Sequence, residues 1–285
     1  MKTKIALSLL AFSASCAIAE VKIISGAAIA KNKRPYQEDR FTHVIDIGGE
    51  FFGVYDGHGG ADVSTLLSRN LQRYFANNTG STQEKLQCAF DQADYESQNL
   101  WPDEGSTALV VFVDKHDTLH GAWCGDTRAV LECNGKVCFA TNDHKPDRKD
   151  EKERIERAGG KIYKHGVWRV NGLAVSRSIG DKACKVQGVG QIIATPEYAQ
   201  KQLTSDNHFL IMATDGLWDV MGNEEVVALV RRAMQQKKNC TSIAVILRDL
   251  AIEKGSNDNI TVCVVKFDWQ PRSLVRRLWN WLIGT

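Results

Sequence analysis

An acidic, glycine-rich segment follows one of the most apolar runs of this 285-residue chain. The run at residues 51–55 is followed directly by Asp56, Gly57 and His58. Glycine lets a backbone carbonyl approach a ligand closely, and a carboxylate at the end of a buried strand can bind a hard divalent ion. An Asp-Gly-His-Gly sequence is also an ordinary turn. By itself, the segment therefore leaves metal binding and a simple turn equally open.

Two further acidic turns adjoin apolar runs. Asp215 follows the run at residues 209–213, with Asp219 four positions later, and Asp258 lies just before the run at residues 260–262. Aspartate in a turn often only hydrogen-bonds to the local backbone. Because that interpretation would have to hold at three strand ends, the set as a whole favours a cluster of metal-binding acids.

A guanidinium and two more carboxylates lie close together upstream, at Arg34, Glu38 and Asp39. Arginine recognises phosphate through its planar fork of donors, although an exposed ion pair is the commoner role of such a residue. All-oxygen ligands favour Mg²⁺ or Mn²⁺ over zinc, and the chain has no Cys/His spacing typical of a zinc site. These residue types suit phosphate chemistry at hard divalent ions.

Strands and helices must position these residues. β-rich runs predict strands at residues 51–55, 107–113, 119–124, 129–133, 136–140, 209–213 and 260–267. Apolar residues at helical spacing predict helices at residues 63–74, 86–93, 226–230 and 243–250. Each helix has one apolar face, whereas several strands are apolar on both faces. The pattern predicts a layered structure in which helices cover antiparallel sheets.

Two segments depart from this pattern. Residues 177–196 carry several glycines and little periodicity, which predicts a surface loop. Residues 271–285 form a short amphipathic tail with several arginines. The tail could contact a membrane surface or a partner protein, or it could pack its tryptophans on the domain and cap it.

The first nineteen residues resemble an export signal. Lys2 and Lys4 precede an apolar run at residues 5–10, which thins into small residues that end at Ala19. This order is typical of a Sec-type signal peptide. An ordinary N-terminal strand or helix is the alternative. We expect cleavage after Ala19, followed by one domain over residues 20–270.

Composition excludes some classes of function. Cleavage would remove two lysines and no acids, so the 36 basic and 34 acidic side chains become 34 and 34. A near-neutral mature chain has no electrostatic footprint for nucleic acid. No later stretch has the roughly eighteen apolar residues that a membrane span requires. We expect a soluble monomer.

Cysteine usage does not indicate a disulfide framework. Seven cysteines would remain after cleavage, and several lie within predicted strands like small core residues. A hairpin centred on Asn134-Gly135 would pair residue 133 with residue 136. Cys133 and Cys138 would then be diagonal, which is a poor geometry for a bridge. We expect mostly free, buried thiols.

The chain resembles the metal-dependent protein phosphatases, also called type 2C serine/threonine phosphatases, over roughly residues 22–268. The segments above carry the resemblance, together with others in the family's order: Gly105-Ser106-Thr107-Ala108, Cys124-Gly125-Asp126-Thr127-Arg128, Asp143-His144-Lys145-Pro146, Glu151-Lys152-Glu153-Arg154-Ile155, Ala158-Gly159-Gly160, Val170-Asn171-Gly172-Leu173-Ala174-Val175-Ser176-Arg177 and Asp258-Asn259-Ile260-Thr261-Val262. It implies an α+β fold, a four-layer α-β-β-α sandwich with two central antiparallel sheets flanked by helices.

The resemblance also implies a two-metal site. Asp56 would bridge two Mn²⁺ or Mg²⁺ ions, the Gly57 carbonyl oxygen would bind one of them, and Asp215 and Asp258 would hold the other. A water that bridges two such ions, about 3.5–4 Å apart, has a lowered pKa and can attack phosphorus directly. The implied reaction is hydrolysis of phosphoserine or phosphothreonine in proteins.

Further positions match the family's supporting residues. Arg34 would bind the substrate phosphate, and Glu38 and Asp39 would orient metal-bound waters. Asp126 and Asp219 match a weaker third metal site.

His58 would protonate the departing seryl oxygen as general acid, since its ordinary pKa lies near the working range. A structural turn residue is the alternative for His58. The segment at residues 170–174 is one residue shorter than usual in the family, and the loop at residues 178–196, which forms a flap beside the family's active site, is short.

Two rival functions share this fold. One is an inactive member that acts as a binding module, but the chain retains Asp56, Asp215 and Asp258. The other is a phosphatase for small phosphate esters, which the same site would permit. Since protein phosphoserine lies mainly inside cells, export of such an enzyme suggests delivery into another cell, such as a host.

Overall fold

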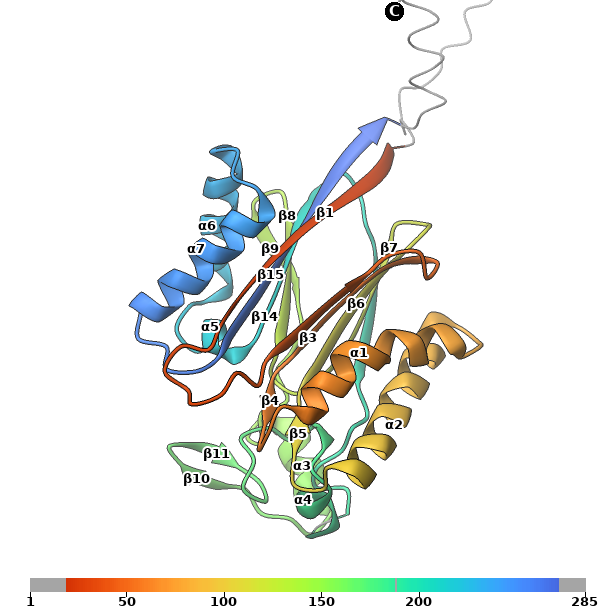
Figure 1. Cartoon of the computed structure of the whole chain (residues 1–285), viewed down its shortest axis with the longest axis vertical. Helices are drawn as coiled ribbons and strands as arrows, with labels where there is room; N and C mark the ends of the chain where they lie inside the picture. Colours follow the sequence, from red (N-terminus) through yellow and green to blue (C-terminus); the bar gives the residue numbers. More distant parts are fainter. Residues whose placement is uncertain (1–18, 188, 272–285) are drawn as a thin grey trace, which may run out of the picture.

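The structure is a computed structural model that describes residues 19–187 and 189–271. Two five-stranded antiparallel sheets lie face to face, and helices cover the outer face of each (Figure 1). The predicted four-layer α-β-β-α sandwich is therefore confirmed. The predicted signal peptide and tail lie outside the described residues, apart from Ala19 and Pro271 at their inner ends. No helix within residues 19–187 and 189–271 is long and apolar enough to cross a membrane.

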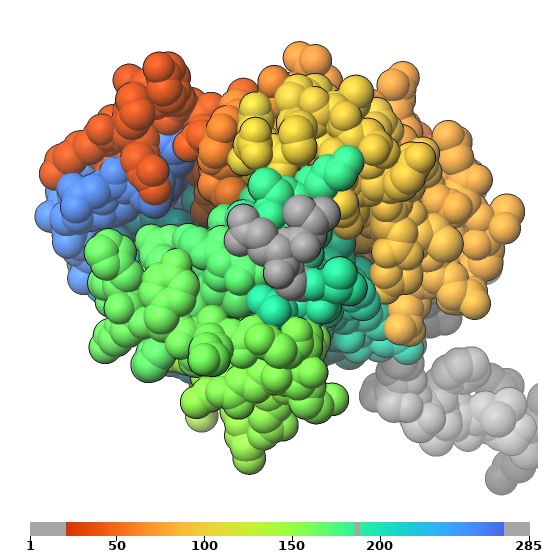
Figure 2. All heavy atoms as spheres, turned by 90° about the horizontal axis from the view of Figure 1, so that it is seen from below, coloured from red at the N-terminus to blue at the C-terminus, as the bar shows by residue number. Residues whose placement is uncertain are grey.

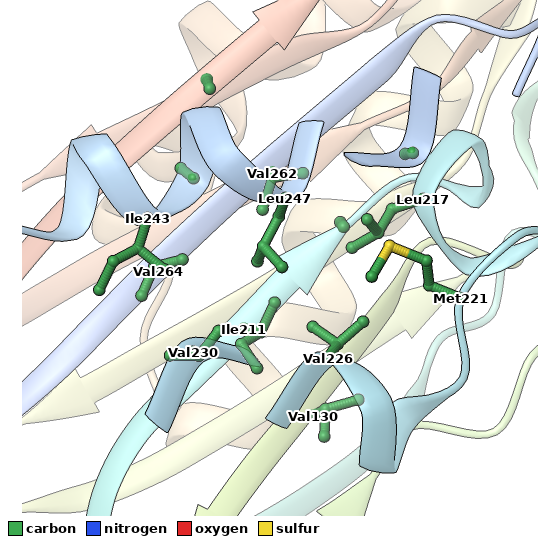
Figure 3. Close-up of a cluster of buried hydrophobic side chains, with 14 of the residues drawn as sticks. Val130, Ile211, Leu217, Met221, Val226, Val230, Ile243, Leu247, Val262 and Val264 are labelled. Atoms are coloured by element: carbon green, nitrogen blue, oxygen red, sulfur yellow. The ribbon is translucent and has the colours of Figure 1, made fainter. Parts of the chain in front are cut away.

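The first sheet has the strand order β1-β15-β14-β8-β9. Its strands are β1 (Ala19–Ala30), β15 (Ile260–Pro271), β14 (Asn207–Ala213), β8 (Arg128–Cys133) and β9 (Lys136–Ala140). The helices α5 (Asp215–Trp218), α6 (Asn223–Gln235) and α7 (Cys240–Glu253) belong to its side of the molecule. Figure 3 shows Ile211 and Val264 of this sheet among Val230, Ile243 and Leu247 of the helices. This helix–sheet contact forms the first of three main layers of core.

The second sheet has the strand order β13-β7-β6-β3-β2. Its strands are β13 (Glu197–Gln202), β7 (Thr118–Cys124), β6 (Ala108–Asp114), β3 (Gly49–Tyr55) and β2 (Arg40–Val44). The helices α1 (Asp62–Asn77) and α2 (Thr82–Leu100) cover it. A capping box between Ser81 and Glu84 satisfies backbone donors at the start of α2. Leu67 and Phe90 of these helices are fully buried in the second layer of core.

Strands of both sheets bury alternate residues in different layers. In β3, Phe51 and Tyr55 face α1 and α2, whereas Phe52 and Val54 pack between the sheets. The same alternation in β14 sends Ile211 to the helices and Leu210 to the space between the sheets. Because side chains alternate along a strand, a strand inside this sandwich must be apolar on both faces. Burial of each such side chain contributes about 1.5–3 kcal/mol.

Smaller elements gather at the lower end of the sandwich in Figure 1. They are the sheet β12 (Ile179–Gly180), β5 (Gly105–Ser106) and β4 (Gly57–His58), the hairpin β10 (Tyr163–His165) and β11 (Val167–Arg169), and the helices α3 (Lys149–Arg157) and α4 (Lys182–Gln187). The prediction of a surface loop at residues 177–196 is partly wrong. Ser178, Ile179 and Asp181 are buried, because β12 pairs with β5 and Ile179 packs into the core under α1 and α2.

The expectation that Cys133 and Cys138 stay free is wrong. Residue 133 does pair with residue 136, but the register shifts between Leu131 and Glu132, so Cys138 becomes the extra residue of a β-bulge. The bulge brings the two Cα atoms to 5.6 Å, and the thiols form a disulfide. The other described cysteines are free; three of them are buried, Cys184 is half-buried and Cys88 is exposed.

Candidate active site

A cleft of about 480 Å³ opens at the end of the sandwich that carries the small elements. It is lined by every predicted site residue except Asp39: Arg34, Glu38, Asp56, Gly57, His58, Asp126, Asp215, Asp219 and Asp258. Figure 2 views this end from below, with the red-orange N-terminal segment and the green β10–β11 segment both in sight. Val167 and Arg169 of that hairpin also line the cleft, as do Asp181 and Cys184 from the predicted loop.

The two sheets deliver the central carboxylates from opposite sides. Asp56 follows β3, Asp215 follows β14, and Asp126 lies where the chain crosses from β7 in one sheet to β8 in the other. One carboxylate oxygen from each of these three residues lies within 4.8 Å of the other two. Thr107 fixes the backbone of Asp56, since its Oγ1 accepts from Asp56 N at 3.0 Å and its N donates to Asp56 O at 2.9 Å. The scaffold therefore concentrates negative charge at one point.

Close backbone contacts bring the third acidic turn beside this cluster. A Cβ atom on Gly216 would overlap the carbonyl oxygen of Asn259, so only glycine lets the start of α5 approach the turn that holds Asp258. The buried Asn259 side chain then fastens the N-terminal loop. Its Nδ2 donates to the carbonyl oxygens of Lys31 (2.9 Å) and Tyr36 (3.0 Å), and its Oδ1 accepts from Glu38 N (2.8 Å). The sequence does not predict that the Asn259 side chain fastens this loop.

Burial and mutual repulsion raise the pKa values of carboxylates in this cluster. Burial raises the pKa of Asp56 well above its ordinary value, and the neighbouring charges of Asp39 and Asp215 raise it further. Burial also raises the pKa of Asp215, with a further contribution from Asp126. Asp215 Oδ1 is buried without a hydrogen-bond partner among the residues described. Unpaired carboxylate oxygens at this density fit hard divalent cations, which oxygen ligands prefer.

Two cations of the chain partly compensate this charge. Arg34 Nη2 donates to Asp258 Oδ2 at 2.7 Å, and Lys145 Nζ contacts Asp126 Oδ2. Asp258 lines the cleft but does not belong to the tight cluster of three carboxylates. The cluster therefore differs from the predicted ligands in one residue, because it contains Asp126 in place of Asp258. Asp219 lies at the rim with an exposed side chain. Partial desolvation raises its pKa, the charge of Lys145 opposes this rise, and the charge of Asp126 adds to it. Lys145 belongs to the motif Asp143-His144-Lys145-Pro146, but nothing in the sequence predicts its contact with Asp126.

Asp39 lies behind the cleft rather than in its wall. Its side chain is buried, and its Oδ2 accepts from Thr214 Oγ1 (3.0 Å) and Thr261 Oγ1 (2.8 Å). Its Oδ1 is buried without a hydrogen-bond partner in the described part of the chain. Burial raises the pKa of Asp39 to about 7. Asp39 thus adds an unpaired oxygen next to Asp56.

His58 is held by an acid that sequence reasoning missed. Its Nε2 lies 3.0 Å and 2.9 Å from the two carboxylate oxygens of Asp181. Burial lowers the pKa of His58, but the hydrogen bond and charge of Asp181 more than offset this, so the pKa is raised. The only signal in the sequence is Gly180-Asp181, inside a segment without periodicity.

Comparisons with known proteins identify the family of the chain. Residues 38–260 match the family Protein phosphatase 2C. "Probable protein phosphatase 2C 69" of Arabidopsis thaliana is 39% identical over 86% of this chain and 70% of that protein. "Probable protein phosphatase 2C 45" of Oryza sativa subsp. japonica is 36% identical over 86% of this chain and 88% of that protein.

Solved structures show the same fold. A C. elegans sex determining protein has a TM-score of 0.76 at 26% identity, over 86% of this chain and 64% of that one. A phosphatase from a pathogenic strain of Toxoplasma gondii has a TM-score of 0.78 at 24% identity, over 87% of this chain and 95% of that one. This likeness establishes a shared fold and nothing further. With its sandwich, its acidic cleft and these relatives, the chain belongs to the protein phosphatase 2C family, a family of protein serine/threonine phosphatases.

Proposed function

We propose that this chain is a metal-dependent phosphatase that hydrolyses phosphoserine and phosphothreonine in proteins. The observation that carries the proposal is the convergence of Asp56, Asp126 and Asp215 to within 4.8 Å, in one cleft with Arg34 and His58. Membership of the protein phosphatase 2C family supports the substrate class.

The residues present fit divalent metal ions. Asp56, the Gly57 carbonyl, Asp215 and Asp258 would hold two Mn²⁺ or Mg²⁺ ions, and Asp126 with Asp219 would hold a weaker third. Bound ions would lower the pKa of the attacking water and stabilise the charge on the phosphoryl oxygens. The buried, unpaired Oδ1 atom of Asp215 is the structural feature that supports this assignment.

The chain's own residues would bind the substrate and move protons. Arg34 would leave Asp258 and grip the phosphate with its forked donors. Glu38 and Asp39 would orient the attacking water. His58 would give a proton to the seryl or threonyl oxygen as its bond to phosphorus breaks, so that the product leaves as a neutral alcohol.

Asp215→Asn tests the proposal. This variant removes one charge but keeps the shape of the side chain, so we expect a folded protein that binds Mn²⁺ more weakly by calorimetry and has lost most hydrolysis of a phosphoserine peptide. Asp206→Asn, at an exposed aspartate remote from the cleft residues, is the matched control and should behave as wild type. Unchanged manganese-dependent hydrolysis by Asp215→Asn would refute the proposed site.

We also propose that residues 1–19 direct export and that the mature enzyme acts in another cell, such as a host cell. One feature supports export: the Cys133–Cys138 disulfide suits an oxidising compartment. N-terminal sequencing of protein from the culture medium should begin at Glu20. Full-length protein retained in the producing cytosol would overturn this proposal.

A further inference from the structure

We propose that Asp181 is the positioning residue for His58: it holds ring atom Nε2, so that Nδ1 is the nitrogen that meets the departing seryl oxygen. The inference rests on the proposed function, because it concerns the proton that leaves His58 in that reaction. It adds to the site a residue that touches neither phosphate nor metal ligand.

The geometry separates the two roles. Both carboxylate oxygens of Asp181 lie within 3.0 Å of Nε2, so the ring is held on one edge. The Asp181 side chain is only 3% exposed, whereas that of His58 is 31% exposed and lines the cleft. With Nε2–H donated to the carboxylate, Nδ1 is the ring nitrogen left for a substrate. A buried aspartate sets the orientation and tautomer of histidine in the same way in Ser-His-Asp hydrolases.

The small sheet β12-β5-β4 builds this contact. His58 of β4 and Gly180 of β12 both lie opposite Gly105 of β5, so the residue after Gly180 arrives beside the imidazole. A Cβ atom on Gly105 would overlap Asp181 Oδ2 and would lie 2.5 Å from His58 Nε2. The contact between Asp181 and His58 therefore requires glycine at position 105.

The neighbouring segments fix the backbone of Asp181. Its φ is 54°, in the left-handed region that aspartate enters more readily than most residues. Its backbone is fixed on both sides: its N donates to Glu104 O at 2.8 Å, and its O accepts from Cys184 N and Lys185 N at the start of α4. Within residues 19–187 and 189–271, the hydrogen bonds of its carboxylate go to His58 alone. A buried acid whose carboxylate is directed at a histidine of the cleft indicates a positioning role.

In the proposed step the bond between phosphorus and the seryl Oγ breaks, and its electron pair stays on Oγ. The proton on Nδ1 passes to Oγ, which leaves His58 neutral. The attacking water forms the new bond to phosphorus and gives up one proton to solvent, from which His58 is protonated again. A seryl alkoxide needs this proton to leave, whereas p-nitrophenolate is stable without it. Misplacing the imidazole should therefore affect the two kinds of ester differently.

Leaving-group dependence tests the inference in the full chain with Mn²⁺. For Asp181→Asn, kcat on a phosphoserine peptide should fall on the order of 10²-fold, and kcat on p-nitrophenyl phosphate by no more than about threefold. The KM for both substrates and the Mn²⁺ affinity measured by calorimetry should stay near wild type. Asp206→Asn is again the matched control.

A double variant separates positioning from general damage. If Asp181 acts through His58, then Asp181→Asn combined with His58→Asn should be no slower on the phosphoserine peptide than His58→Asn alone. Equal losses on both substrates, or additive losses in the double variant, would overturn the inference. Should Asp181→Asn fail to fold, Gly105→Ala perturbs the same contact from the other strand and must show the same selective loss.

The two proposals fail in different ways. A wild-type protein that is inactive on both esters with Mn²⁺ would overturn the proposed function and the inference with it. An active wild type whose Asp181→Asn variant keeps its rate on the phosphoserine peptide would overturn only the inference.

Discussion

Arg34 and Asp258 form an ion pair with each other. In the proposed reaction, however, Arg34 binds the substrate phosphate and Asp258 binds a metal ion. Their contact of 2.7 Å joins side chains that are 49% and 33% exposed. The pKa of Arg34 is raised chiefly by its hydrogen bond to Asp258. An exposed ion pair contributes only about 0–1 kcal/mol, so a phosphate on Arg34 and a metal ion on Asp258 can separate the pair at little cost.

Arg34→Ala should therefore impair substrate binding and not metal binding. We expect KM for a phosphoserine peptide to rise about tenfold or more, since a forked contact to phosphate is lost. Calorimetry should show a Mn²⁺ affinity equal to wild type or tighter, because Asp258 becomes free. Lys33→Ala, at the exposed neighbouring position, is the control. A weakened Mn²⁺ affinity with unchanged KM would contradict the assignment of Arg34.

At the scale of the elements, the strands that carry the acids are also the centre of the core. β14 is buried between α7 on one face and the second sheet on the other, and its last residue is two positions before Asp215. The end of such a strand has little freedom to move. Core packing at Ile211 and Leu210 therefore fixes where the Asp215 carboxylate lies.

Ile211→Ala should destabilise the fold by about 2–5 kcal/mol, because it leaves a cavity between β14 and the helices. Ile211 is fully buried (Figure 3). Urea unfolding gives the free energy of unfolding from the midpoint and slope. Tyr95→Ala removes a side chain from a position that is 74% exposed and should change stability by no more than about 0.5 kcal/mol. If Ile211→Ala lowers the free energy of unfolding by less than Tyr95→Ala does, the packing of Ile211 against the helices does not support the sandwich.

At the scale of the whole molecule, two sheets end at one acidic point. The folded state raises the pKa values of Asp39, Asp56 and Asp215, chiefly by burial, so it binds more protons than the unfolded chain. Such groups stabilise the fold at low pH and lose that contribution as pH rises through their folded pKa values. Glu197 has the opposite sign: despite its burial, its interactions with His144 and then Arg148 lower its pKa to about 2. Its contribution to stability is complete above about pH 4.5 and is lost as pH falls toward 2.

The metal-free protein should therefore lose stability between about pH 5 and pH 7, where Asp39 titrates with a pKa of about 7. Each carboxyl that keeps its proton in the folded state while it is ionised in the unfolded chain costs on the order of 1 kcal/mol per pH unit. Urea unfolding in EDTA at several pH values measures the slope, and Mn²⁺ should restore most stability at the upper end. Asp215→Asn removes one of these charges and should flatten the slope. A slope that is flat in wild type, or unaltered in that variant, would contradict the account of the cluster.

Local patterns in the sequence determined most of the scaffold. β-rich runs predicted strands, and β3, β6, β7, β8, β9, β14 and β15 occur where those runs lie. The runs that are apolar on both faces, such as those of β3 and β14, form strands buried inside the sandwich. The placement of Asp56, Asp215 and Asp258 beside such runs predicted that they would meet, because the strands of stacked sheets end together. The roles of these aspartates came from the family resemblance and remain proposals.

Contacts between distant segments were decided only by the tertiary structure. Asp181 meets His58 across 123 positions through the register of three short strands, and Asn259 binds the carbonyl of Lys31 across 228. The disulfide depends on a one-residue bulge that places Cys138 against Cys133. Periodicity reports which face of an element is buried, but it carries no information on register between elements. The acids could therefore be found from the sequence, and the residues that hold them in place could not.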